Sequence, residues 1–197
     1  FNEIMNFLIK TRILILIFFS FLISCQPVEL IQDVVFDNKI LNKFNIVAEE
    51  KVINNFYEVK YEEKYIDSSL PNPPQIRLYN WLDENFIIFG SENKLIINIL
   101  DASITKIERE NSNKKKYEGK NEFYYELSFV VEYILYSDDE SILAKTQVQT
   151  MRSTTSSLYI SINEKELIID NMILDALKDL SVKSEELIKQ HMSKFIL

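Results

Sequence analysis

The sequence predicts an α+β protein, a two-layer sandwich in which two helices lie on one face of a four-stranded antiparallel or mixed sheet. Three observations favour this fold. Apolar and polar residues alternate in four segments, as in strands with one buried face. In two further segments apolar residues recur every three or four residues, as in amphipathic helices. The order strand, helix, three strands, helix (βαβββα) lets both helices cover the same apolar sheet face.

The first strand and the first helix are predicted on either side of a proline-rich loop. Residues 44–59 alternate imperfectly and predict the strand. The apolar spacing of residues 74–89 predicts the helix, with Pro74 at the first helical position, where its missing N–H is not needed. Gly90 is expected to close this helix in a left-handed cap. The only tryptophan, Trp81, is expected in the core on the sheet-facing side rather than as a binding anchor.

Three further strands are predicted in succession. In residues 94–107 the alternation changes phase, which predicts a strand with a bulge near Leu100 and Asp101. Asp101 is expected to bond the local backbone there. Residues 123–135 alternate most regularly. Residues 141–161 predict the last strand, whose polar second half is either an edge or a loop.

A long amphipathic helix is predicted to end the chain. Asn163 and Glu166 have the spacing of a helix-capping pair. The apolar stripe then runs from Ile169 to Phe195, with a break expected around Ser181. The ordered part, about 150 residues, is long enough to bury a core of its own.

The first residues have the layout of a secretory signal. Lys10 and Arg12 precede an apolar run over residues 13–23, which is shorter than the roughly 20 residues of a membrane-spanning helix. Met5 is expected to be the true start. The run ends in Leu22-Ile23-Ser24-Cys25, which resembles the lipobox of bacterial lipoproteins.

The resemblance to the lipobox implies cleavage before Cys25 and lipid attachment to its thiol. It divides the chain into a signal peptide (1–24), a lipid-attachment and tether segment (25–43) and the α+β domain (44–197). Gln26 stands where enteric lipoproteins retained in the inner membrane carry Asp. By resemblance, this residue favours the periplasmic side of the outer membrane.

Composition excludes several classes of site. The chain has a net charge of −8, which disfavours nucleic acid as a partner. Cys25 is its only cysteine and His191, expected at the surface, its only histidine, so thiol-based zinc sites and Ser-His-Asp triads are excluded. Two glycines are too few for a phosphate-binding loop. We therefore expect no catalytic residue, metal or cofactor, and a chain that is not an enzyme.

The element order is similar to that of the lipopolysaccharide-assembly lipoprotein of the outer membrane (the LptE type) and of auxiliary lipoproteins of lipid-transporting ABC systems. The stretch PPQIRLYNWLDENFIIFGSENKLIINILDASI, residues 73–104, also resembles a pattern in uncharacterised alphaproteobacterial lipoproteins. These resemblances imply an envelope role. They carry no catalytic motif and assign no functional residue.

The candidate binding surface is the polar end of the last predicted strand. It comprises Arg152, Ser153, Thr154, Thr155, Ser156 and Ser157. These residues suit an edge that pairs with a partner strand, although the same composition also suits a ligand rim or an edge protected from aggregation. Helix 164–194 is a second candidate surface, and Lys114, Lys115 and Lys116 are expected in a solvated loop.

Two functions follow as hypotheses. The first is a non-catalytic assembly or transport accessory that docks onto an envelope protein. The second is a carrier that holds an acyl chain between the sheet and the helices. An enzyme with a carboxylate-based site is a distant third hypothesis.

Overall fold

The computed structural model describes Val34, residues 36–111 and residues 120–197. The predicted signal peptide, the predicted lipidation residue Cys25, Gln26 and the lysine run 114–116 lie outside the described residues.

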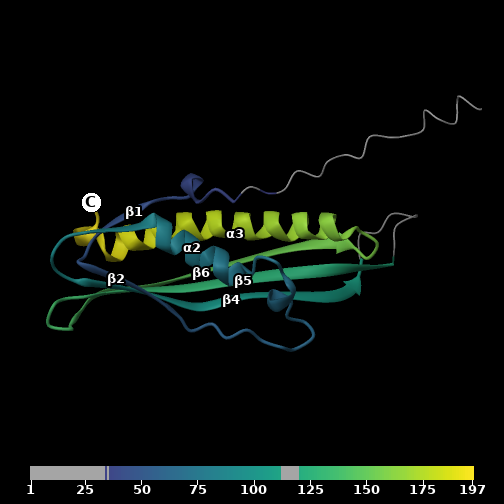
Figure 1. Ribbon diagram of the computed structural model, residues 1–197, viewed down its shortest axis with the longest axis horizontal. Helices are drawn as coiled ribbons and strands as arrows, with labels where there is room; N and C mark the ends of the chain where they lie inside the picture. Colours follow the sequence, from purple (N-terminus) through teal and green to yellow (C-terminus); the bar gives the residue numbers. More distant parts are fainter. Residues whose placement is uncertain (1–33, 35, 112–119) are drawn as a thin grey trace, which may run out of the picture. The chain divides into compact units, whose positions relative to one another are not determined.

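The main sheet has four strands in the order β2-β4-β5-β6 (Figure 1). They are β2 (Glu50–Asn55), β4 (Lys94–Glu110), β5 (Asn121–Tyr136) and β6 (Ile142–Ser157). Strand β2 pairs parallel with β4, whereas β4, β5 and β6 pair antiparallel in sequence. The sheet is therefore mixed, which is one of the two forms predicted, antiparallel or mixed.

The helices α2 (Pro74–Asn85) and α3 (Ile162–His191) form the second layer. Helix α2 packs on β4, and α3 packs on β5 and β6. On β5, Leu127, Phe129 and Val131 are fully buried, while the intervening side chains point to the other face and are partly exposed. This second face is called the open face below. The two-layer α+β sandwich predicted from the periodicities is confirmed.

The prediction of one strand over residues 44–59 is wrong, because the chain forms two strands that belong to different sheets. Strand β1 (Phe44–Val47) pairs parallel with β3 (Phe86–Phe89) in a separate two-stranded sheet, while β2 joins the main sheet. The chain changes sheets at Glu49, whose N–H donates to the carbonyls of Glu92 (3.0 Å) and Asn93 (2.9 Å).

The predicted helix over residues 74–89 ends early, at Asn85, and its last four residues are β3. The aromatic and β-branched run of β3 favours a strand. Phe86 is buried between the rings of Phe44 (centroids 4.4 Å apart) and Tyr133 (5.1 Å). Pro74 begins the helix as expected. Gly90, at φ +143°, follows a strand and does not cap a helix.

The bulge in β4 is confirmed, since its register with β5 shifts between Ile99 and Asp101. The carboxylate of Asp101 accepts from the N–H of Ser103 at 3.2 Å, as expected of a side chain that bonds local backbone. Strand β6 is continuous through Ser157, so its polar second half is an edge strand and not a loop.

The N-cap of α3 is Ser161, two residues before Asn163, so the predicted capping pair of Asn163 and Glu166 is wrong. Ser161 Oγ accepts from the N–H of Glu164, whose carboxylate accepts from the N–H of Ser161 in return. The break expected near Ser181 is absent. Its hydroxyl faces inward and accepts from the N–H of Asn42 at 2.9 Å, while the Ser184 hydroxyl bonds the Tyr133 hydroxyl at 2.9 Å. Both hydroxyls thus have partners inside the fold, and the helix continues through Ser181.

The single tryptophan lies in the core, as predicted. Trp81 is 0% exposed and meets Phe44 and Phe86 edge to face, with ring centroids 6.4 and 5.8 Å away. It therefore packs α2 onto the small sheet of β1 and β3.

Asp67, in the loop before α2, has a buried carboxylate that links this loop to strand β4. Sequence analysis did not single it out. Asp67, 2% exposed, accepts from the Tyr57 hydroxyl at 2.5 Å and from the N–H of Ile104 at 2.9 Å. Burial, foremost, and the neighbouring Asp67 raise the pKa of Tyr57. Asp67 thus satisfies a backbone donor of β4 beyond the end of β2.

Candidate docking edge at strand β6

Strand β6 is the last strand of the main sheet, and within the described ranges no strand pairs with its outer edge. Its side chains alternate as predicted. Ala144, Thr146 and Val148 are buried beneath α3, whereas Lys145 and Gln147 are exposed on the open face. The strand is thus held on one edge by β5 and on one face by α3, and no strand of the described part pairs with its other edge.

One contact identifies the backbone groups of the outer edge. Lys183 of α3 donates from Nζ to the carbonyl oxygen of Gln149 at 3.2 Å, so this carbonyl points away from β5. Backbone groups of alternate residues in a strand point to the same edge, and the β5 register is continuous here. The residues before the end of the strand that direct N–H and C=O outward are therefore Lys145, Gln147, Gln149, Met151, Ser153 and Thr155.

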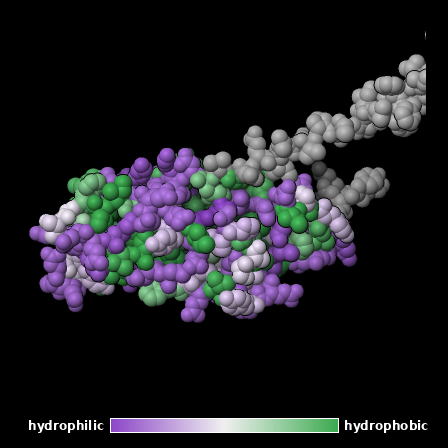
Figure 2. Space-filling view, viewed as in Figure 1, coloured by the Kyte–Doolittle hydropathy of each residue, from purple (hydrophilic) through white to green (hydrophobic). Residues whose placement is uncertain are grey.

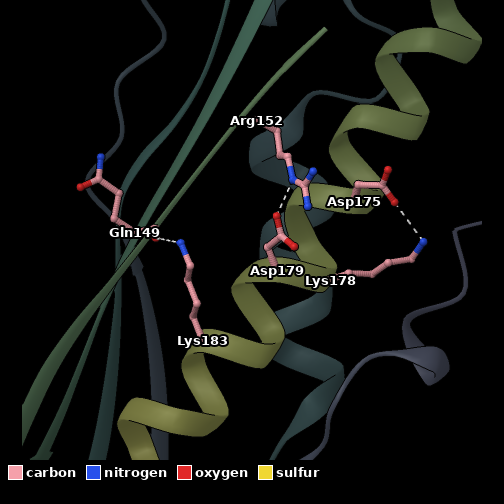
Figure 3. A network of polar contacts seen from close by, with 6 residues as sticks. All are labelled: Gln149, Arg152, Asp175, Lys178, Asp179 and Lys183. Carbon is pink, nitrogen blue, oxygen red and sulfur yellow. Dashed lines mark hydrogen bonds and ion pairs between the residues drawn. The ribbon is translucent and has the colours of Figure 1, made fainter.

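A network of polar contacts, called the β6–α3 network below, joins this strand to the helix (Figure 3). It comprises Gln149, Arg152, Asp175, Lys178, Asp179 and Lys183. Arg152 Nε donates to the carboxylate of Asp179, and Lys178 Nζ lies 3.1 Å from the carboxylate of Asp175. The hydrogen bond from Arg152 lowers the pKa of Asp179. Two of the three cations of the network are thus paired with carboxylates, and Lys183 contacts a neutral carbonyl.

The six predicted site residues do not form one continuous surface. Arg152, Thr154 and Ser156 lie on the helix side of the strand, and Ser153, Thr155 and Ser157 on the open face. Ser156 is 7% exposed and donates to the Tyr125 hydroxyl at 3.4 Å. By the alternation set out above, Ser153, Thr155 and the last residue of the strand, Ser157, direct their backbone groups to the outer edge.

The candidate second surface, helix 164–194, corresponds to α3 (Ile162–His191), followed by a short 3₁₀ helix, Ser193–Phe195. Lys178 and Lys183 are exposed on its outer side, and Val182 is 61% exposed. His191, expected at the surface, is exposed.

A ladder of polar side chains crosses all four strands on the open face. The Asn54 amide donates to Asn98 at 3.0 Å, and the Asn98 amide donates to Glu132 at 3.0 Å. Lys145 Nζ lies 2.7 Å from the Glu132 carboxylate. The hydrogen bond from Lys145 lowers the pKa of Glu132. The ladder therefore ties β6 to the strands behind it.

Pockets in the described part lie at the surface. One, of about 460 Å³, is formed by α2, the start of α3 and the segments before α2, and is lined in part by Phe36, Arg77 and Asp170. Arg77 pairs with Asp170 at 2.7 Å and lies over the ring of Phe36. The space between helices and sheet is filled by side chains such as Leu78, Trp81 and Phe129, each 0% exposed.

Figure 2 shows hydrophilic residues over much of one face, with smaller groups of hydrophobic ones between them. Within the described residues, no group of three or more His, Cys, Asp or Glu side chains is placed to hold a metal ion. None of the described helices is both long and apolar enough to cross a membrane.

Sequence analysis missed the α3 residues of the network. Asp179 and Lys183 are four residues apart and flank the buried stripe of α3, which is the one signal that was available. Which β6 residues they contact depends on the position of α3 along the strand. Sequence periodicity does not predict that position.

Comparison with known proteins gives similarity at the level of structure. No family model matches the chain, and no curated protein matches it by sequence. Among 14 matching solved chains are a minor lipoprotein from Acinetobacter baumannii and a protein of the DUF330 family from Xanthomonas campestris. A third is the rare lipoprotein B of Shewanella oneidensis.

These similarities are distant. The minor lipoprotein is 9% identical (TM-score 0.34) and is matched over 77% of this chain and 96% of its own. The DUF330 protein is 8% identical (TM-score 0.34), and the match covers 76% of this chain and 90% of the DUF330 protein. Rare lipoprotein B is 16% identical (TM-score 0.33), and the match covers 73% of this chain and 100% of rare lipoprotein B. At these values the likeness establishes neither a common family nor a common function.

Proposed function

We propose that this chain is a lipid-anchored docking protein of the bacterial envelope. It holds another envelope protein by pairing strand β6 with a strand of that partner, and has no turnover of its own. The observation that carries the proposal is the outer edge of β6, where six residues direct backbone groups away from β5 and no strand of the described part pairs with them.

Strand addition suits this edge energetically. Each backbone hydrogen bond contributes a net of about 0.5–1.5 kcal/mol, so a partner strand that bonds several of the six residues gains a useful affinity. The edge is also held in place before binding, by the ladder through Lys145 and by the pairing of Arg152 with Asp179. A preorganised edge loses less conformational entropy when the partner arrives.

The membrane part of the proposal rests on the sequence. The motif Leu22-Ile23-Ser24-Cys25 resembles a lipobox, and acyl chains on Cys25 hold the domain at a membrane surface. Gln26 favours the periplasmic side of the outer membrane. The acidic composition supports a protein partner over nucleic acid.

A proline variant tests the edge. Ser153→Pro removes one outward N–H without breaking a bond to β5, because the proline lies on the free side of an edge strand. With a photocrosslinking residue at Gln147, we expect partner capture in intact cells to fall at least tenfold. We expect thermal unfolding of the purified variant to stay close to that of the unchanged chain.

The matched control is Ser153→Ala, which changes the side chain and keeps the N–H. Capture by this variant should equal that of the unchanged chain. Equal capture by the proline and alanine variants would show that β6 does not accept a strand, and the proposed function would be wrong.

A further inference from the structure

We infer that the strand accepted by β6 carries a carboxylate that pairs with Lys183. The inference rests on the proposed function and specifies the chemistry of the partner. Among the six outward-facing residues, Gln149 has a carbonyl that accepts from a side chain of α3, Lys183 Nζ. The ammonium therefore lies where an incoming strand would bond β6.

The geometry requires the ammonium of Lys183 to move. A paired strand lies about 4.7–4.9 Å from β6 and directs an N–H at each outward carbonyl. At Gln149 the place of that N–H is taken by Lys183 Nζ, 3.2 Å from the oxygen. Strand addition thus displaces the ammonium from this carbonyl and leaves an exposed positive charge beside the new strand.

The nearby acidic side chains of the β6–α3 network already have partners. Asp179 accepts the hydrogen bond of Arg152, and Asp175 is paired with Lys178 at 3.1 Å. The charge of Lys183 also contributes to the lowered pKa of Asp179, although less than Arg152 does. A carboxylate on the incoming strand would give Lys183 a charge-assisted hydrogen bond without competing with these pairs.

The fold determines where that carboxylate stands. Helix α3 covers the face of β6 that carries Val148, Thr150 and Arg152. Side chains of the incoming strand that lie opposite these residues point to the same face. An Asp or Glu opposite Val148 or Thr150 comes next to Gln149 and so reaches Lys183. On a chain with a net charge of −8, a cationic position of this kind selects an acidic strand and orients it.

A second copy of this chain is a poorer occupant. Strand β6 contains no acidic residue, and its charged side chains are Lys145 and Arg152. If two copies paired through β6, like charges would be placed along the seam and Lys183 would receive no carboxylate. The occupant that complements the edge is an acidic strand from a different protein.

The test compares charge variants in intact cells, with the photocrosslinking residue at Gln147. We expect Lys183→Glu to reduce capture at least tenfold and Lys183→Arg to retain it within about twofold, because charge decides the interaction. The matched control is Lys189→Glu, an exposed lysine of the same helix that lies outside the β6–α3 network and is paired with Glu185. Its capture should match that of the unchanged chain.

The trapped peptide provides a second readout. Sequencing of the trapped peptide should find Asp or Glu beside the crosslinked position. Replacing that acidic residue of the partner with Lys should restore capture by the Lys183→Glu variant. If Lys183→Glu captures normally while Ser153→Pro does not, the inference about charge is wrong and strand docking stands. Normal capture by both Lys183→Glu and Ser153→Pro would overturn the proposed strand docking together with the inference about charge. If the trapped protein is a second copy of this chain, the inference about an acidic partner strand is wrong.

Discussion

Replacing Trp81 with alanine should lower the free energy of unfolding by about 3–5 kcal/mol, a large part of the stability of a typical domain. The ring is 0% exposed and packs edge to face against Phe44 and Phe86. Its removal leaves a cavity where α2 meets β1 and β3, and the surrounding rings cannot close it fully. Urea unfolding of the purified domain, followed by circular dichroism, measures the loss.

The matched control is Tyr79→Ala, on the same helix but 44% exposed, for which the expected loss is much smaller. In the unchanged chain Trp81 should fluoresce at the short wavelength of a buried indole. An emission spectrum like that of tryptophan in water, or a Trp81→Ala loss no larger than that of Tyr79→Ala, would contradict the placement of the ring in the core.

Replacing Cys25 with alanine should move the mature protein from the membrane fraction to the soluble fraction. The alanine cannot accept lipid, and each methylene buried in the bilayer contributes about 0.8 kcal/mol, so several acyl chains account for stable attachment. The variant should be exported behind a cleavable signal without a lipobox, so that the apolar run over residues 13–23 is removed.

Treatment of cells with globomycin provides the complementary measurement on the unchanged chain. Inhibition of lipoprotein signal cleavage should make the uncleaved precursor accumulate. A Cys25→Ala protein that still pellets with membranes after a high-salt wash, or a precursor unaffected by globomycin, would show that the anchor lies elsewhere.

Periodicity predicted the layers because it depends on which side of each element is buried. The alternation in residues 123–135 and the stripe from Ile169 onward each specified a buried face, and both faces are buried as expected. The phase change at Asp101 likewise revealed the bulge, since one extra residue reverses the side of every later side chain.

The predictions that failed concern short segments whose structure depends on distant partners. Residues 86–89 continue the apolar spacing of α2, and it is pairing with β1 that makes them a strand. The same pairing separates β1 from β2, which sequence analysis joined into one strand. In α3, Ser181 does not break the helix because Asn42, far away in sequence, supplies its hydrogen bond.

The candidate site was predicted in part. The polar composition of residues 152–157 indicated an edge, and β6 is an edge strand. Which of those residues direct backbone groups outward became clear only from the contact between Lys183 and Gln149. Lys183 itself lies in helix 164–194, the predicted second surface, but sequence analysis did not single it out.

Hydrogen exchange of the β6 amides tests strand docking most directly. In the isolated chain, the amides of Gln147, Met151 and Ser153 should exchange faster than those of Val148 and Thr150, which point toward β5. In the complex with the captured partner, the fast amides should become protected as the added strand bonds them. If they exchange equally fast with and without the partner, β6 does not accept a strand and the account is contradicted.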